Sequence, residues 1–158
     1  MNIISIKEME KSIVTNFFIT HWGSPQIVIS SGIFNCNDLD GFAALDENGK
    51  IIGLVTYVFD GNECEIISLD SIEENKGIGT ILIQQVESNA QENGFQQIKL
   101  ITTNDNLNAL GFYQKKGYKL VKVFQNAVEK ARGIKPEIPL FADNGIPIRD
   151  EILLQKLL

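Results

Sequence analysis

The sequence has no excess of positive charge. Its 14 Lys and Arg residues are outnumbered by 20 Asp and Glu residues, which gives a formal net charge of -6. A nucleic-acid-binding protein needs a basic surface, so we expect no nucleic-acid partner. A single small anion needs only a local basic patch, and the acidic total therefore still allows a phosphate-bearing ligand.

Metal-binding and membrane-spanning patterns are also missing. Cys36 and Cys64 each stand alone, without a CxxC or Cys/His spacing, so we expect two free thiols, a reducing compartment and no metal. Residues 1–11 lack the apolar core of a signal peptide, and no apolar run reaches the length of a membrane span. These absences predict a cytoplasmic protein that does not associate with membranes.

The chain also lacks internal repeats, low-complexity tracts and linkers rich in Pro, Gly or Ser, so no domain boundary is visible. A chain of 158 residues is long enough to bury a substantial core. We therefore expect a single domain over residues 1–158.

Hydrophobic periodicity predicts an alternation of strands and helices. The predicted helices cover residues 7–20, 78–93, 106–116 and a short stretch within 126–135, and the segment 21–25 is expected to end the first helix. The predicted strands cover residues 26–30, 41–46, 50–59, 64–72, 95–103 and 118–124, and the final segment 149–158 favours a strand over a helix. This order predicts a mixed α/β sheet rather than a Rossmann domain.

A glycine-rich turn precedes the predicted helix 78–93. Gly77 and Gly79 allow successive backbone N–H groups to point to one side, and such a nest at a helix start favours an anion. The same turn also occurs without a ligand. No Gly-Lys-Ser/Thr follows it, as a Walker loop requires, and Leu82 stands where GxGxxG needs its last glycine.

Two motifs together resemble the GNAT superfamily of N-acetyltransferases, in particular its small single-domain bacterial members. The later motif, NLNALGFYQKKGY, matches the family pattern at Asn106, Ala109, Phe112, Tyr113, Gly117 and Tyr118. The earlier motif, ENKGIGT, matches at Gly77 and Gly79 but carries Glu74 where the family has Gln or Arg, and Asn75 where a glycine is common. The resemblance implies a central mixed, mostly antiparallel sheet of about six or seven strands flanked by about four helices. The core motifs fall within 40–124, and 125–158 forms a C-terminal extension.

The resemblance implies acetyl-CoA as the co-substrate. Main-chain amides of the glycine loop would hold its pyrophosphate, the strand before the loop would pair with its pantetheine arm, and Glu74 would point to solvent. The implied cofactor-binding residues are Leu69, Asp70, Ser71, Asn75, Lys76, Gly77, Ile78, Gly79, Thr80, Asn106 and Tyr113. Asn106 is equally suited to capping the helix that it precedes.

The resemblance also implies Tyr113 as the acid that protonates the CoA thiolate, and packing in the core is the other interpretation of this tyrosine. For the base we consider Glu63, Glu65 and Asp70, each of which is otherwise a solvated carboxylate at a strand edge, and we select Glu65 and Asp70. In a regular strand Asp70 lies on the face opposite to the two glutamates, and a bulge would reverse this. Proton loss to water is an alternative.

Several further residues have both a structural and a functional interpretation. His21 is interpreted as a capping or packing residue rather than a base, and Trp22 as a core residue or a wall of the acceptor site. Arg132, Lys135 and Arg149 of the extension either form surface ion pairs or bind an acidic group of the acceptor.

We therefore expect an N-acetyltransferase that acts by direct transfer in a ternary complex, as a monomer or homodimer. Its acceptor would be the primary amine of a small molecule or peptide. The alternative is a domain that binds acyl-CoA as a sensor or interaction module without turnover, and a weaker one is a strand-mediated dimer whose tail matters more than any ligand.

Overall fold

The computed structural model describes residues 1–73 and 76–158. These residues form two compact units, one made of residues 1–27, 34–98 and 158, and the other of residues 28–33 and 99–157. No helix within the described residues is both long and apolar enough to cross a membrane.

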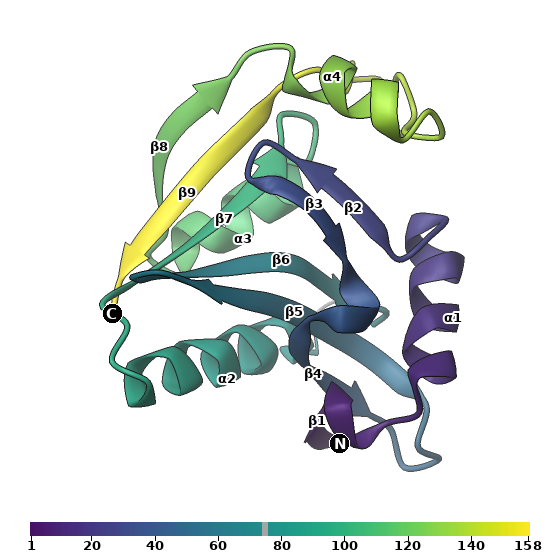
Figure 1. Cartoon of the computed structure of the whole chain (residues 1–158), viewed down its shortest axis with the longest axis vertical. Helices are drawn as coiled ribbons and strands as arrows, with labels where there is room; N and C mark the ends of the chain where they lie inside the picture. Colours follow the sequence, from purple (N-terminus) through teal and green to yellow (C-terminus); the bar gives the residue numbers. More distant parts are fainter. Residues whose placement is uncertain (74–75) are drawn as a thin grey trace. The chain divides into compact units, whose positions relative to one another are not determined.

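The first unit is built on four antiparallel strands. They are β1 (Asn2–Ser5), β4 (Asp40–Leu45), β5 (Ile51–Asp60) and β6 (Glu63–Ser71), which pair in that order. The short 3-10 helix η1 (Ile6–Glu8) connects β1 to helix α1 (Lys11–Trp22), and a second one, η2 (Cys36–Asp38), leads into β4 and packs against α1. Helix α2 (Ile78–Glu92) packs along β4, β5 and β6 and buries one apolar stripe against them (Figure 1).

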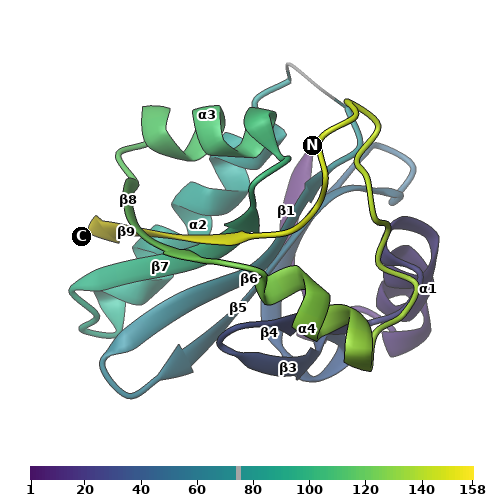
Figure 2. The same ribbon diagram turned by 90° about the horizontal axis from the view of Figure 1, so that it is seen from above.

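The second unit holds the later motif and the C-terminal extension. It contains most of β7 (Gln97–Thr103), then α3 (Leu107–Lys115), β8 (Lys119–Phe124), α4 (Ala127–Ile134) and β9 (Glu151–Leu157) (Figure 2). Strand β9 pairs antiparallel with β8, which confirms the strand predicted at the chain end. Strands β2 (Gln26–Ile29) and β3 (Gly32–Asn35) form a separate two-stranded sheet.

The main sheet has seven strands in the order β1-β4-β5-β6-β7-β9-β8. It is mostly antiparallel, and the described residues also form four α-helices. The predicted fold class is therefore confirmed.

Three local expectations were wrong. Helix α1 begins at Lys11 rather than residue 7, because residues 6–8 tighten into η1, where the Ser5 hydroxyl accepts the Lys7 N–H at 3.4 Å. The same helix continues through His21 and ends only at Gly23, which adopts a left-handed φ of 81°. Strands β1 and β3, each of 4 residues, were not predicted, because so short an apolar run carries little periodicity.

Candidate active site

The glycine loop leads into the first turn of α2. Gly77 adopts a left-handed φ of 72° at the N-cap position, and a Cβ placed on it would meet no atom within 4 Å. No side chain caps this helix end and its first turn carries no acidic residue, as far as the described residues show. The amides of this first turn have no carbonyl partner within the helix, so they and the helix dipole favour an anion. The backbone therefore fits the pyrophosphate that the resemblance implies.

Close packing against β5 fixes the position of this helix start. Ile78 is 2% exposed and Leu82 is 0% exposed, and both lie over Gly53. A Cβ on Gly53 would overlap Cγ2 of Ile78 and lie 3.0 Å from Cδ1 of Leu82. Only a glycine in β5 allows α2 to approach this closely. Sequence reasoning missed Gly53, because its role depends on which helix crosses the strand.

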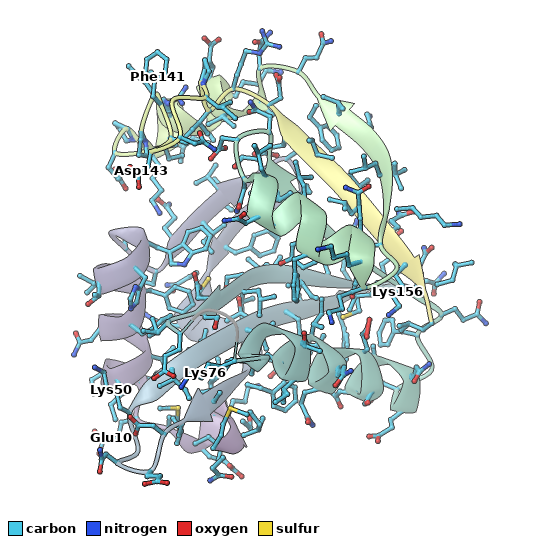
Figure 3. All side chains as sticks on the ribbon, turned by 180° about the vertical axis from the view of Figure 1, so that it is seen from behind. Glu10, Lys50, Lys76, Phe141, Asp143 and Lys156 are labelled. Atoms are coloured by element: carbon cyan, nitrogen blue, oxygen red, sulfur yellow. The ribbon has the colours of Figure 1, made fainter. Side chains whose placement is uncertain are left out.

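Two loop residues of the prediction lie outside the described residues. These are Glu74, expected to point to solvent, and Asn75, expected to donate its amide. Lys76 lies just before α2 (Figure 3), where its Nζ is 3.5 Å from a carboxylate oxygen of Glu73. Both side chains are well exposed, so this ion pair contributes little stability and leaves the lysine able to approach an anion.

The end of β6 has the extended backbone expected beside the pantetheine arm. Leu69, Asp70 and Ser71 pair with Val55, Leu54 and Gly53 of β5. The Ser71 hydroxyl donates a hydrogen bond to the carbonyl oxygen of Glu73 at 2.9 Å, which orients the chain as it leaves the strand.

A bulge in β6 decides which carboxylates share a face. Tyr57 pairs with Ile66 and Thr56 pairs with Ser68, so Ile67 is the extra residue. Since one added residue shifts the alternation by one, Asp70 lies on the same face as Glu65. The arrangement of a regular strand is therefore wrong for this protein, and the bulged alternative is correct.

The two candidate bases have different surroundings. Glu65 is 4% exposed. Asp70 is partly buried, and its Oδ2 accepts a hydrogen bond from Nε1 of Trp22 at 2.9 Å. Burial raises the pKa of the Asp70 carboxyl above its ordinary value, although the Trp22 hydrogen bond and the nearby His21 oppose this. Trp22 is half-buried and contacts a candidate catalytic group. Neither interpretation of Trp22 from the sequence, as a core residue or as a wall of the acceptor site, included this contact.

His21 takes the packing role that the sequence suggested. Its ring lies 4.4 Å from that of Phe17, centroid to centroid, one turn earlier on α1. The imidazole is exposed, and its position in the last turn suits the negative end of the helix dipole.

The later motif lies in the second unit. Asn106 caps α3, because its side-chain oxygen accepts the N–H of Ala109 at 3.2 Å, as predicted. Tyr113 is 7% exposed, and its ring lies edge-on to Phe112 and Tyr118 at 5.3 and 5.7 Å. The unit thus holds the tyrosine ring in one orientation. Asn106 and Tyr113 belong to this unit, whereas the other described cofactor-binding and catalytic candidates lie in the first unit.

The extension is held by side-chain bonds that the sequence did not reveal. Arg132 donates to the carbonyl oxygens of Ile138 and Pro139 at 3.2 and 2.7 Å, and to that of Ile148 at 2.5 Å. It therefore clamps the chain, and it forms no ion pair with a residue of 1–73 or 76–158. Arg149 does form an ion pair, with Asp150 at 3.0 Å.

The comparisons with known proteins concern the family and the fold of the chain. A model of the acetyltransferase (GNAT) family matches residues 8–118. The uncharacterised protein YdhI of Bacillus subtilis is 62% identical over 158 residues, which are 100% of this chain and 99% of its own. A GNAT family acetyltransferase from Elizabethkingia anophelis, solved with acetyl-CoA bound, is 25% identical over 78% of each chain, with a TM-score of 0.67. A Bacillus subtilis acetyltransferase solved with CoA is 17% identical with a TM-score of 0.70, over 99% of this chain and 98% of its own, which shows the likeness of fold.

Proposed function

Because the chain belongs to the GNAT acetyltransferase family, whose model covers residues 8–118, we propose that it transfers an acetyl group from acetyl-CoA to a primary amine of a small molecule or peptide. The observation that carries the proposal is the start of α2, where left-handed Gly77 opens a helix end that no described side chain caps. The bound acetyl-CoA of the Elizabethkingia anophelis relative supports the same co-substrate here.

The proposal requires the two compact units to work as one domain over residues 1–158. The core motifs at 40–124 would supply the co-substrate site, and the extension 125–158 would complete the second unit around Tyr113. The family model supports this, because it runs through residues of both units without a break.

The binding step relies mainly on the backbone. The amides of Lys76, Gly77, Ile78, Gly79 and Thr80 would hold the pyrophosphate, with the Lys76 ammonium adding charge. Leu69, Asp70 and Ser71 would offer strand amides and carbonyls to the pantetheine arm, and Asn106 would reach the same arm beyond its role as a cap. Asn75, outside the described residues, belongs to the same proposed loop.

The chemical step needs a base, an oxyanion donor and an acid. When bound, acetyl-CoA supplies the acetyl thioester. Asp70 or Glu65 would take a proton from the acceptor ammonium, and the neutral amine would then form the new C–N bond while the C–S bond breaks. Strand amides near Leu69 would donate to the carbonyl oxygen, and the Tyr113 hydroxyl would give its proton to the departing sulfur. The second proton of the amine, released as the amide forms, would restore the hydroxyl of Tyr113.

Two measurements test the proposal. Calorimetry measures acetyl-CoA binding, and CoA release is followed with a panel of polyamines, amino acids, aminoglycosides and peptide N-termini. Binding together with release from at least one amine is the expected result. Acetyl-CoA binding without CoA release in the presence of any amine would favour the alternative, an acyl-CoA sensor. If acetyl-CoA does not bind, both functions are wrong.

The role of Tyr113 has a matched control. Tyr113→Phe should lower CoA release by about 100-fold, since general acid catalysis contributes roughly that much, and should leave acetyl-CoA binding unchanged. Tyr118→Phe removes a hydroxyl from another buried tyrosine of the same unit, 1% exposed, and should keep full turnover. Equal activity of the two variants would remove Tyr113 from the mechanism.

A further inference from the structure

Trp22, the last residue of α1, contacts the carboxylate of Asp70 on strand β6. Trp22 donates its indole N–H to Oδ2 of Asp70 at 2.9 Å. Two backbone features bring these residues together. The left-handed Gly23, whose N–H bonds to the Ile19 carbonyl at 3.1 Å, ends the helix directly after the tryptophan. The extra residue Ile67 turns Asp70 to this face of the strand.

The kind of partner distinguishes this carboxylate from a structural ion pair. A partly buried carboxylate that only stabilises a fold is usually paired with Arg or Lys, which lowers its pKa and weakens it as a base. Asp70 instead receives a neutral donor on one oxygen. Its Oδ1 accepts no side-chain hydrogen bond from residues 1–73 or 76–158. The indole thus fixes the direction of the carboxylate, and its hydrogen bond does not cancel the rise in the pKa of Asp70 that burial causes.

The charged groups around Asp70 are few. From α1 the nearby titratable group is His21, which favours the ionised carboxylate. On β6 the same face carries Glu63 and Glu65. On β5 that face carries Leu54, Thr56, Val58 and Asp60, of which only Asp60 is charged; it pairs with Glu63, at the far end of the strands from Asp70. Thr56 and Ser68 pair with each other, hydroxyl to hydroxyl, at 2.6 Å, so they do not compete for the carboxylate.

We propose that Trp22 is a positioning residue, which holds Oδ2 of Asp70 so that Oδ1 accepts the proton of the acceptor amine. This inference rests on the proposed acetyl transfer and selects Asp70 over Glu65 as the base. Trp22 itself neither gives nor takes a proton.

A ligand-free titration tests the pair first. Trp22 is the only tryptophan, so its indole N–H signal in a nitrogen-15 NMR spectrum is unambiguous. We expect this signal to shift with pH through one inflection above the ordinary aspartate pKa of about 3.9. The inflection should vanish in Asp70→Asn and persist in His21→Gln. A signal that ignores pH between 3 and 8, or titrates equally in Asp70→Asn, overturns the proposal.

Kinetics then separate positioning from packing. Trp22→Phe keeps an aromatic ring but removes the donor that lowers the pKa of Asp70. The acidic limb of the kcat/KM profile should therefore move to higher pH. The kcat should fall about ten-fold through lost orientation, with the KM for acetyl-CoA unchanged. In an Asp70→Asn background the same substitution should have no further effect.

Spermidine, kanamycin and alanylglycine serve as acceptor probes. If wild type releases CoA with one of them and Trp22→Phe keeps the wild-type acidic limb, the positioning role is wrong while the proposed function stands. If none is acetylated and the wider panel also fails, the proposed function falls and takes the base role with it. The wild-type titration decides on the pair even if Trp22→Phe does not fold.

Discussion

Replacing Gly53 by alanine should weaken both the fold and acetyl-CoA binding. The new methyl would overlap Cγ2 of Ile78 and lie 3.0 Å from Cδ1 of Leu82 and 3.2 Å from the carbonyl oxygen of Asp70. Ile78 and Leu82 are 2% and 0% exposed, so neither side chain has space into which to withdraw. Relief therefore requires a shift of the α2 backbone at the end that carries the glycine loop.

The magnitude follows from two opposing effects. Overpacking a core by one methyl costs about 1–3 kcal/mol, and the less flexible unfolded chain returns about 0.4–1 kcal/mol. The net loss in the free energy of unfolding is about 1–2 kcal/mol, which lowers the Tm of a protein of this size by about 2–8 °C. To bind acetyl-CoA, the variant would have to reverse this shift of α2. If that costs about 1 kcal/mol of binding free energy, the Kd for acetyl-CoA rises about five-fold.

Urea unfolding and calorimetry with acetyl-CoA measure the two effects. Gly133→Ala is the control, because a methyl there meets nothing within 4 Å in α4 and should stabilise that helix by about 0.5–1 kcal/mol. Adding Ile78→Ala removes the overlapping Cγ2, so the double variant should lose at least about 0.5 kcal/mol less than the sum of the two single changes. A Gly53→Ala protein with wild-type stability and wild-type affinity would refute this account of the loop.

Three further predictions concern Asp70, Arg132 and the cysteines. Asp70→Asn should lower CoA release about 100-fold. Burial raises the pKa of Asp70, so the ionised carboxylate costs stability at pH 7, and Asp70→Asn should have the higher free energy of unfolding at that pH. As the pH falls toward the unfolded aspartate pKa of about 3.9, this difference, measured by urea unfolding, should shrink. A difference that stays constant with pH would contradict the reasoning. Arg132→Lys should lower the free energy of unfolding by about 2 kcal/mol, because one ammonium cannot span three carbonyl oxygens. Lys130→Ala, at an exposed position of the same helix, is the control. If the two variants are equally stable, the clamp is contradicted. Burial raises the pKa of Cys64 to about 12, and both cysteines are 0% exposed. Ellman's reagent at pH 8 should therefore detect no fast-reacting thiol in the native protein and two thiols after denaturation. A fast reaction in the native protein would contradict this burial.

Local signals in the sequence were sufficient for much of the fold. Helix α2 has a strong apolar stripe between Gly77 and Gly94, and both glycines adopt the left-handed φ that a helix boundary favours. Strands β4 and β5 match the predicted strands 41–46 and 50–59, and the Glu-Asn-Gly turn between them has Gly49 at a φ of 78°. The Asn106 cap followed from the residue type and its place before α3.

The features that were missed depend on residues far apart in the chain. The bulge at Ile67 exists only relative to the register of β5, so no pattern within β6 distinguishes it from a regular strand. The hydrogen bond from Trp22 to Asp70 spans 48 residues and requires both the bulge and the late end of α1. The candidate site was therefore predictable as a set of residues but not as a geometry.

The bonds that hold the extension also imply an order of folding. Arg132 reaches carbonyls 6, 7 and 16 residues ahead of it, whereas the Asn104 side chain binds Pro147, Arg149 and Asp150 across 43, 45 and 46 residues. Short loops close at a smaller entropic cost than long ones. We therefore expect the turn after α4 to form around Arg132 early in folding, and its attachment to Asn104 beside α3 to be one of the last steps.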